Sequence, residues 1–417
     1  MAKTPTQGWA TVRLISGARA LSILGDELAI FAVLLREKHL GGGALSISLI
    51  IAAGSLPLVL FSPLAGTFAD RIPVRRLAPV VNILQAIFAA LLAYRAPLPV
   101  SLLIIFLLGV GQAFTSPAWA ATLPQIVDKD LLPRALSLMQ ALYAIAAMLG
   151  PAISGLMISR FGYVTPMIAN SISFLVIAMV PIFLELPSKG RQKGPRSRGD
   201  LWVGLQWVRR EPVFRALAIL LFSLNITAGI FSVAELFFAL DALHASTFAY
   251  GLCATFFAAG SLSAALVNER RSVPAPRLPA NIVAGCLMAS LGILLAGFSW
   301  HWGVLLPTAA LGGIGVSTLN TYGLALILQR APENSRARVA AAVFAISSVG
   351  QLSSLAIASV VVSAINPRIV ILASGAACLL VLARFSPGVL NSSEPAGGVE
   401  VEEMSEMDVS RPPEPEE

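Results

Sequence analysis

Twelve long apolar segments restrict what this chain can fold into more than any other feature of its sequence. They lie at about 12–35, 44–69, 77–95, 98–123, 134–158, 163–185, 213–239, 246–267, 279–298, 302–328, 337–363 and 367–385. A helix that crosses a lipid bilayer needs about 20 apolar residues, and these segments have that length. Only 12% of the residues are charged and 56% are hydrophobic, a composition that cannot cover a protein surrounded by water. The predicted fold class is therefore an all-α polytopic membrane protein with 12 transmembrane helices.

One long polar break divides the twelve segments into six and six. The sequence predicts an N-terminal six-helix bundle, a basic cytoplasmic linker, a C-terminal six-helix bundle and a disordered acidic cytoplasmic tail, at 1–186, 187–212, 213–386 and 387–417. Within the linker, "DLWVGLQWVRR" is amphipathic and places Trp202 and Trp207 beside two arginines. Such a pattern is typical of a helix that lies on the inner leaflet. The tail is rich in acidic residues and proline and poor in apolar residues, a composition typical of disorder.

The distribution of basic residues predicts the orientation in the membrane. With a cytoplasmic N-terminus, 23 of the 29 Lys and Arg residues fall on cytoplasmic segments, five fall outside, and Arg19 lies within the first span. Cytoplasmic loops of membrane proteins carry such an excess of Lys and Arg. We therefore expect both termini in the cytoplasm and the chain integral to the plasma membrane, which is the inner membrane in a bacterium. These residues explain the net charge of +7, and no nucleic-acid partner is expected.

The two halves of the chain repeat each other. Segments of the fourth and fifth spans correspond to segments of the tenth and eleventh at an offset of about 204 residues, with Gly109 and Gly111 aligned to Gly313 and Gly315. Six-span repeats in parallel orientation are typical of transporters, and they place the substrate path at the interface between the halves.

A charged motif follows the second span. In "GTFADRIPVRRL", Gly66 precedes Asp70 and Arg71, and Arg75 and Arg76 follow. The motif resembles the loop signature of the major facilitator superfamily. The resemblance implies two pseudo-symmetric six-helix bundles and a cytoplasmic gate, in which the carboxylate and the arginines form a cluster that breaks when the inner side opens. Anchoring by positive charge alone would explain the arginines but not Gly66 or Asp70.

Further segments are similar to one branch of that family. Pro73 replaces a second glycine that is common in the signature, and "GVGQAFTSPAWAATLPQIVDKDLLPRALSL" is similar to the fourth span of drug exporters. This branch includes macrolide and tetracycline-type efflux proteins and siderophore exporters. The segment "GPAISG", with Gly150, Pro151 and Gly155, resembles the antiporter motif of the fifth span, although Ala146 stands where the family often has glycine. Such glycines and prolines let helices pack closely and bend.

No motif in the sequence predicts catalysis. A GxxxxGK[ST] phosphate loop, a GxSxG nucleophile and an HExxH metal motif are all absent from the sequence. The three cysteines occur singly and are interpreted as packing residues, so no metal site is expected. We expect a protein that is not an enzyme, needs no cofactor and uses a proton gradient as its energy source.

Three acidic residues lie within the spans, namely Asp26 and Glu27 in the first and Glu235 in the seventh. A charge at the bilayer centre costs about 2.5–3.5 kcal/mol on insertion scales, so these side chains are expected to face the bundle interior. The resemblance implies that both spans line the central cavity, with Glu235 opposite the pair near mid-membrane. Successive helical residues point about 100° apart, so one acid of the pair is expected to face the cavity, Asp26 being favoured, and the other a helix seam.

Other polar residues within the spans are candidates for the cavity wall or for bonds between helices. Arg19 lies seven residues before Asp26, about 10 Å along the helix axis, which favours a water-bridged contact over a direct ion pair. The uncharged candidates are Gln112, Gln140, Asn225 and Asn320. Each of them could equally well hydrogen-bond to a neighbouring helix.

Four functions remain open from the sequence. The leading hypothesis is proton-coupled export of amphipathic or cationic small molecules by alternating access, as in drug efflux. A dedicated exporter of a siderophore or another metabolite is the second. A lysophospholipid flippase is the third, because "GDELAIF" and the Ser-Pro-Ala segment also resemble bacterial lysophospholipid transporters. A membrane receptor or scaffold is the fourth and has no supporting module. The expected partners are a small-molecule substrate and membrane lipids, and the expected state is a monomer.

Overall fold

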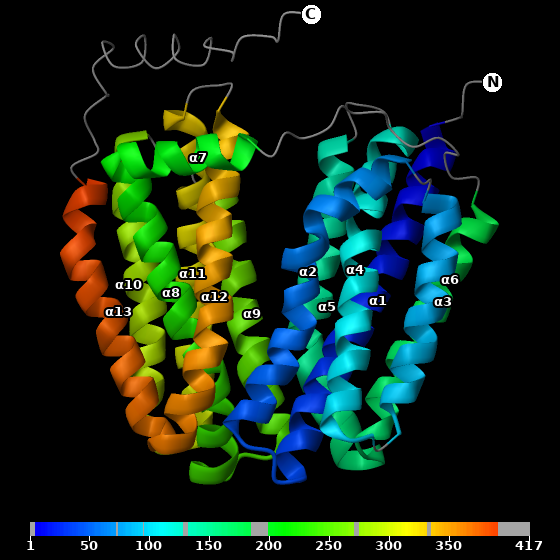
Figure 1. Ribbon diagram of the computed structural model, residues 1–417, viewed down its shortest axis with the longest axis horizontal. Coiled ribbons are helices and arrows are strands. Elements are labelled where there is room, and N and C mark those ends of the chain that lie inside the picture. The colour runs from blue at the N-terminus through cyan, green and yellow to red at the C-terminus, as the bar shows by residue number, and fades with distance from the viewer. Residues whose placement is uncertain are drawn as a thin grey trace, which may run out of the picture.

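The computed structural model of the protein describes residues 5–71, 74–94, 96–127, 132–184, 199–270, 275–331 and 335–390. These residues are almost entirely helical, and no β-strand occurs among them. The first bundle contains α1 (Pro5–His39), α2 (Ala44–Arg71), α3 (Val74–Leu92), α4 (Leu98–Ile126), α5 (Leu132–Phe161) and α6 (Val164–Phe183). The second contains α8 (Pro212–Phe237), α9 (Thr247–Arg270), α10 (Leu278–Gly297), α11 (Trp302–Arg330), α12 (Arg336–Ala364) and α13 (Pro367–Leu390). Figure 1 shows the two bundles side by side.

The helix α7 (Gly199–Arg210) lies across one end of the second bundle (Figure 1). It is the amphipathic helix expected in the linker. Gly204 packs against the backbone of α12 at Arg338, while Trp202 is 63% exposed. The first residues of α1 and the last residues of α13 lie at this same end, which we call the α7 end.

Each of the twelve expected spans corresponds to one helix of the structure, and only the helix ends differ from the expected bounds. Eleven of the described helices are long and apolar enough to cross a membrane. The exception is α1, because Arg19, Asp26 and Glu27 interrupt its apolar stretch. Since α1 packs against α5 and α6 along with the other spans, we count it as the twelfth.

The boundary expected at residue 387 needs correction. The helix α13 continues to Leu390, four residues into the segment assigned to the acidic tail. Val389 is fully buried, and a Cβ on Gly388 would be in van der Waals contact with Ala216 of α8. Packing on the bundle therefore extends the helix. Residues 391–417 and the first part of the linker, 187–198, lie outside the described residues.

The repeat seen in the sequence reappears as equivalent contacts. Gly109 of α4 faces Gly54 of α2, where a Cβ would lie 2.9 Å from the carbonyl oxygen, and Gly313 of α11 faces the backbone of α9 at Phe257. The second glycine of each pair contacts the next helix. A Cβ on Gly111 would lie 2.6 Å from Gln85 of α3, and one on Gly315 would lie 2.6 Å from the carbonyl oxygen of Gly285 of α10. The aligned glycines therefore lie at equivalent helix contacts in the two halves.

The two bundles contact each other mainly through α5 and α9 and through α2 and α12. Residues of α1 add contacts to η2 and α9. In Figure 1 they approach at the end opposite α7 and lie further apart at the α7 end. Phe31 of α1 stacks on Tyr250 of α9 with ring centroids 5.2 Å apart. Lys38 forms an ion pair of 2.7 Å with Asp241, which lies in the π-helix η2 (Phe238–Ala242) after α8.

Candidate transport site

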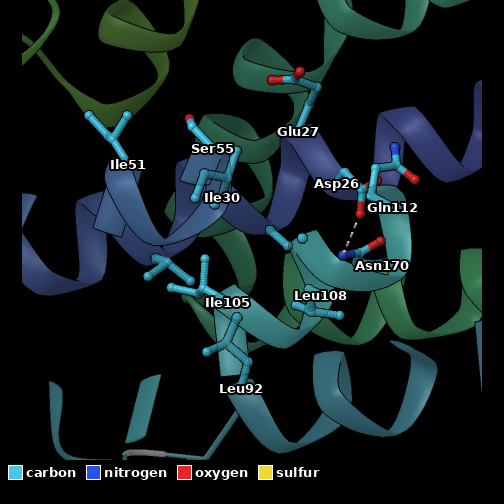
Figure 2. A pocket seen from close by; sticks show the side chains of 14 residues that line it. Asp26, Glu27, Ile30, Ile51, Ser55, Leu92, Ile105, Leu108, Gln112 and Asn170 are labelled. Carbon is cyan, nitrogen blue, oxygen red and sulfur yellow. Dashed lines mark hydrogen bonds between the residues drawn. The ribbon is translucent and has the colours of Figure 1, made fainter. Parts of the chain in front are cut away.

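A cavity of about 300 Å³ opens beside α1 within the first bundle. Its walls come from α1, α2, α3, α4 and α6 (Figure 2). The polar lining residues are Asp26, Glu27, Ser55, Gln112 and Asn170. Most of the remaining surface is aliphatic, from Ala29, Ile30, Val33, Ile51, Leu92, Ile105 and Leu108. Two acidic groups therefore lie in a largely apolar chamber.

Asp26 is held by α6. The side-chain amide of Asn170 donates to Oδ1 of Asp26 at 3.3 Å, the bond drawn in Figure 2. Ser173 Oγ lies 3.2 Å from Asn170 Oδ1 and 2.8 Å from the Asn170 carbonyl oxygen, so it orients the amide. This approach requires Gly25, because a Cβ there would lie 2.5 Å from Asn170 Oδ1. Gly25, Asn170 and Ser173 thus fix the position of the carboxylate.

Glu27 is held by α5. A Cβ on Gly150 would overlap with the Cβ of Glu27, so only glycine leaves room for this side chain. One turn further along α5, Ser154 Oγ donates to the carbonyl oxygen of Leu28 at 2.8 Å. Gly150 belongs to the motif that resembles the fifth span of antiporters, and here its role is to seat an acid of α1.

The expectation that one acid of the pair faces the central cavity between the bundles and the other a helix seam stays a prediction, because all lining residues of the present cavity belong to the first bundle. The two acids share this cavity. Both Asp26 and Glu27 line it, because the cavity extends around α1 from α2 and α4 to α6. Figure 2 shows their side chains leaving α1 in different directions, as the 100° step between helical residues requires.

The position expected for Glu235, opposite Asp26 near mid-membrane, also needs correction. Glu235 lies in the last turn of α8, near the end of the bundle opposite α7. It is close enough to Tyr250 and Cys253 of α9 to interact with them electrostatically. The stacked Phe31 ring follows Asp26 by more than one helical turn, so Glu235 and Asp26 are on different levels.

Of the four uncharged candidates, one lies in the cavity wall and three lie elsewhere. Gln112 lines the cavity. Asn225 donates to the carbonyl oxygen of Leu221 in its own helix. Gln140 and Asn320 are exposed side chains on α5 and α11 outside this cavity.

Sequence reasoning missed Asn170. A lone asparagine within the apolar segment "MIANSIS" was the available signal, because amides in membrane helices normally bond across to a neighbour.

Arg19 is buried and contacts two neighbouring helices. Its Nη2 donates to Ser116 Oγ of α4 at 3.2 Å, and its Nε to the Tyr143 hydroxyl of α5 at 3.4 Å. Among the residues that the structure describes, no ion pair within 4.0 Å joins Arg19 to a carboxylate. The predicted absence of a direct Asp26 contact is consistent with this geometry.

The motif after the second span is described only in part. Gly66, Asp70 and Arg71 belong to the end of α2, but their side chains lie outside the described residues, as does all of Pro73. Arg75 and Arg76 are exposed in the first turn of α3 at the α7 end. The gate assigned to this motif therefore remains a prediction.

The helix 5 motif lies where α5 crosses both α1 and α9. Gly155 packs against α9, where a Cβ would lie 2.9 Å from Phe248 Cα, and Thr247 Oγ1 donates to its carbonyl oxygen at 3.3 Å. The carbonyl group of Pro151 packs against Gly251. The motif thus connects the acid site to the contact between the bundles.

Comparison with protein families identifies the fold. Residues 15–306 match the model of the Major Facilitator Superfamily, which is more than half of the chain. The chain belongs to the major facilitator superfamily. It is therefore an integral membrane transporter of small molecules and not an enzyme.

Relatives with named activities are exporters or transporters. The multidrug efflux pump Tap of Mycobacterium bovis (strain BCG) is 26% identical over 371 residues, 83% of each chain. Macrolide efflux protein A of Streptococcus pyogenes is 25% identical over 42% of this chain and 45% of its own length, so the match spans less than half of that relative. The staphyloferrin A transporter of Staphylococcus aureus is 28% identical over 30% of this chain and 33% of its own.

Solved structures share the fold at low sequence identity. A bacterial homologue of the human lysosomal transporter Spinster, in an inward-facing and unoccupied conformation, superposes with a TM-score of 0.73 at 12% identity, covering 95% of this chain and all of that one. A point mutant of the peptide transporter POT gives a TM-score of 0.72 at 14% identity, covering 94% of this chain and 99% of that one.

Proposed function

We propose that this protein is a proton-coupled exporter of amphipathic or cationic small molecules in the plasma membrane, the inner membrane of a bacterium. The observation that carries the proposal is the largely apolar cavity with Asp26 and Glu27 in its wall. Aliphatic walls bind the apolar part of a substrate, and a carboxylate binds either a proton or a cationic group. Competition between the two for the same acid couples their movements in opposite directions.

The relatives support the direction of transport. Tap is named a multidrug efflux pump and macrolide efflux protein A is named for the export of macrolides. Asp26 and Glu27 are the coupling acids of the proposal, and Glu235 is a further candidate on the other side of the contact between the bundles.

The proposed mechanism is alternating access between the two bundles. The contacts between them lie at the end opposite α7, and the α7 end contains the exposed basic residues of α7 and α3. If the α7 end is cytoplasmic, as the distribution of basic residues predicts, the structure corresponds to a state open to the cytoplasm. The cluster of Asp70 with Arg71, Arg75 and Arg76 would then close that side in the opposite state.

Transport in proteoliposomes tests the proposal. The purified protein is reconstituted, a pH gradient with an acidic interior is imposed, and uptake of radiolabelled erythromycin and of ethidium is measured. We expect accumulation of at least one probe above the level in protein-free liposomes with the same gradient, and this excess should disappear when an ionophore collapses the gradient. Uptake that is insensitive to the gradient, or the absence of uptake for every cationic and amphipathic probe, contradicts the proposal.

Substitutions of the acids test the coupling assignment. Asp26→Asn and Glu27→Gln keep the size of the side chains and remove the titratable group, so gradient-driven uptake is expected to fall in either variant. Glu37→Gln is the matched control, because Glu37 lies on the same helix beyond the cavity. Full uptake by the Asp26→Asn, Glu27→Gln double variant shows that the assignment is wrong.

A dedicated metabolite exporter is the second candidate, favoured by the similarity to the staphyloferrin A transporter. Competition experiments with a carboxylate siderophore in the same vesicles distinguish it from a drug exporter. Movement of lysophospholipid without any gradient would instead indicate a flippase.

A further inference from the structure

Arg19 is a buried cation whose contacts are all to uncharged groups. The residue is only 4% exposed and lies between membrane-crossing helices. Besides the hydroxyl groups of Ser116 and Tyr143, it faces the Tyr143 ring, whose centroid lies 5.9 Å from the guanidinium carbon. The three residues come from α1, α4 and α5.

These contacts use only part of what a guanidinium offers. Arginine has five N–H donors and keeps its charge at any physiological pH, and two of the donors bind the hydroxyl groups. In the described part of the chain, no carboxylate lies within 4.0 Å of this guanidinium. Asp26, the nearest acid along α1, is about 10 Å away along the helix axis and interacts with the guanidinium electrostatically without forming an ion pair within 4.0 Å. A charge in the membrane interior is costly without an anion beside it, so an anionic group of a substrate would be stabilised next to this guanidinium.

The site is partly exposed at its edge. Ser116 and Tyr143 are half-buried, and Gln140, one turn from Tyr143 on α5, is exposed. Arg19 lies on the α7 side of the acid cavity, because α1 runs from the α7 end past Arg19 to Asp26. A substrate bound against α1 and α5 would therefore contact Arg19 toward the α7 end and the two acids toward the opposite end.

We propose that Arg19, Ser116 and Tyr143 form a subsite for an acidic group of the substrate, a carboxylate or a phosphate. The planar guanidinium binds two oxygens of such a group side by side, and the two hydroxyl groups hold it in place. This inference rests on the proposed function and narrows its substrate class. The substrate is an amphipathic zwitterion, with its cationic group at Asp26 and Glu27 and its acidic group about 10 Å further toward the α7 end.

A binding measurement on the full-length purified protein in a neutral detergent tests this subsite. The probes share one fluorophore and one alkyl chain and differ only at the end group: 11-(dansylamino)undecanoic acid, its primary amide and the corresponding amine. Hydrogen bonds to charged groups favour the acid over the amide by about tenfold or more. We expect wild-type protein to show that preference for the acid.

Variants assign the preference to the site. Arg19→Gln is expected to remove the preference for the acid, and Arg19→Lys to keep part of it as a point charge. Arg13→Gln is the matched control, since Arg13 is an exposed arginine on the same helix. If Arg19→Gln fails to fold, the Ser116→Ala, Tyr143→Phe double variant replaces it and is expected to reduce the preference severalfold.

Two results would overturn the inference. The first is equal affinity of wild-type protein for the acid and the amide. The second is an unchanged preference in Arg19→Gln, or in the double variant if that is the one that folds. If the preference is unchanged and the thermal stability of Arg19→Gln is lower, the role of the arginine is to hold three helices together. Because binding is measured without a gradient, a failure of proton coupling leaves these results unaffected.

Discussion

The two acids of α1 show how single residues are positioned in this protein. Each is seated by a glycine and by one neighbouring helix: Asp26 by Gly25 and α6, and Glu27 by Gly150 and α5. Helices in membranes approach closely where small residues lie at the contact, and here the space left by a missing Cβ receives a polar side chain.

Removal of the Asn170 amide is expected to weaken the site. Asn170→Ala deletes the donor to Asp26, and a hydrogen bond to a charged group contributes about 1.5–3 kcal/mol, so the concentration of cationic probe needed for half-maximal uptake should rise about tenfold or more. Asn281→Ala is the control, because the Asn281 amide donates to the carbonyl oxygen of Arg277, four residues earlier in the chain, and does not contact the acids. An unchanged concentration dependence in Asn170→Ala would show that the amide has no part in transport.

A methyl group at residue 150 tests the seat of Glu27. Gly150→Ala places a Cβ where the Glu27 side chain lies, and overpacking of this kind costs about 1–3 kcal/mol. We expect reduced gradient-driven uptake together with a lower melting temperature in detergent. Gly17→Ala on α1, where no atom lies within 4 Å of the added group, should leave both unchanged. Equal behaviour of the two variants would contradict the assigned contact.

At the scale of helices, the repeat is visible as equivalent contacts. In each half the helix that carries the aligned glycines packs against two neighbours at the same two positions. The halves differ in their acids. The first bundle holds two of them in a cavity, whereas Glu235 lies at the end of α8, where the π-helix η2 follows.

Aligned glycines are expected to respond alike to substitution. Gly109→Ala and Gly313→Ala each bring a Cβ against the backbone of a neighbouring helix and should each lower stability by about 1–3 kcal/mol, measured by thermal unfolding in detergent. Gly312→Ala is the matched control, since its added group would be in ordinary contact with Phe257 at 3.8 Å. Tolerance of alanine at only one of the two aligned glycines would show that the packing is not equivalent in the two halves.

At the scale of the whole molecule, the contact between the bundles would determine which state of the proposed alternating-access cycle is populated. The Phe31–Tyr250 stack and the Lys38–Asp241 ion pair both join the bundles at the end opposite α7. Aromatic pairs contribute about 0.5–1.5 kcal/mol beyond burial, whereas exposed ion pairs contribute about 0.2–1 kcal/mol. Asp241 is largely exposed, so the aromatic stack is the stronger of the two contacts.

Loss of the stack is expected to shift the equilibrium between the two states. Phe31→Ala should increase the population in which the α7 ends of the bundles are close together. Spin labels at Ser137 of α5 and Glu269 of α9, two exposed residues at that end, measure this as a shorter distance. Lys38→Gln should change the distribution less. A larger effect of Lys38→Gln than of Phe31→Ala would contradict the conclusion that the aromatic stack is the stronger contact.

Much of the architecture was predictable because hydropathy is a local property of the chain. The twelve spans and the amphipathic helix α7 follow from composition and length, and the glycine pairs follow from the repeat. The contacts of the acids were not predictable. Which faces of the helices meet depends on the rotation and tilt of each helix, and these are determined by packing of the whole bundle.

Hydropathy and the internal repeat were enough to predict a polytopic helical membrane protein with two related halves, and to place Asp26, Glu27 and Gln112 among the polar residues within its spans. Tertiary packing decided that both acids line one cavity, that Asn170 holds Asp26, and that Glu235 lies on another level. It also decided that Arg19 has hydroxyl groups and, among the described residues, no carboxylate beside it. The physical reason is that apolar length is written along the chain, whereas the partners of a buried polar group are brought together from distant segments by packing.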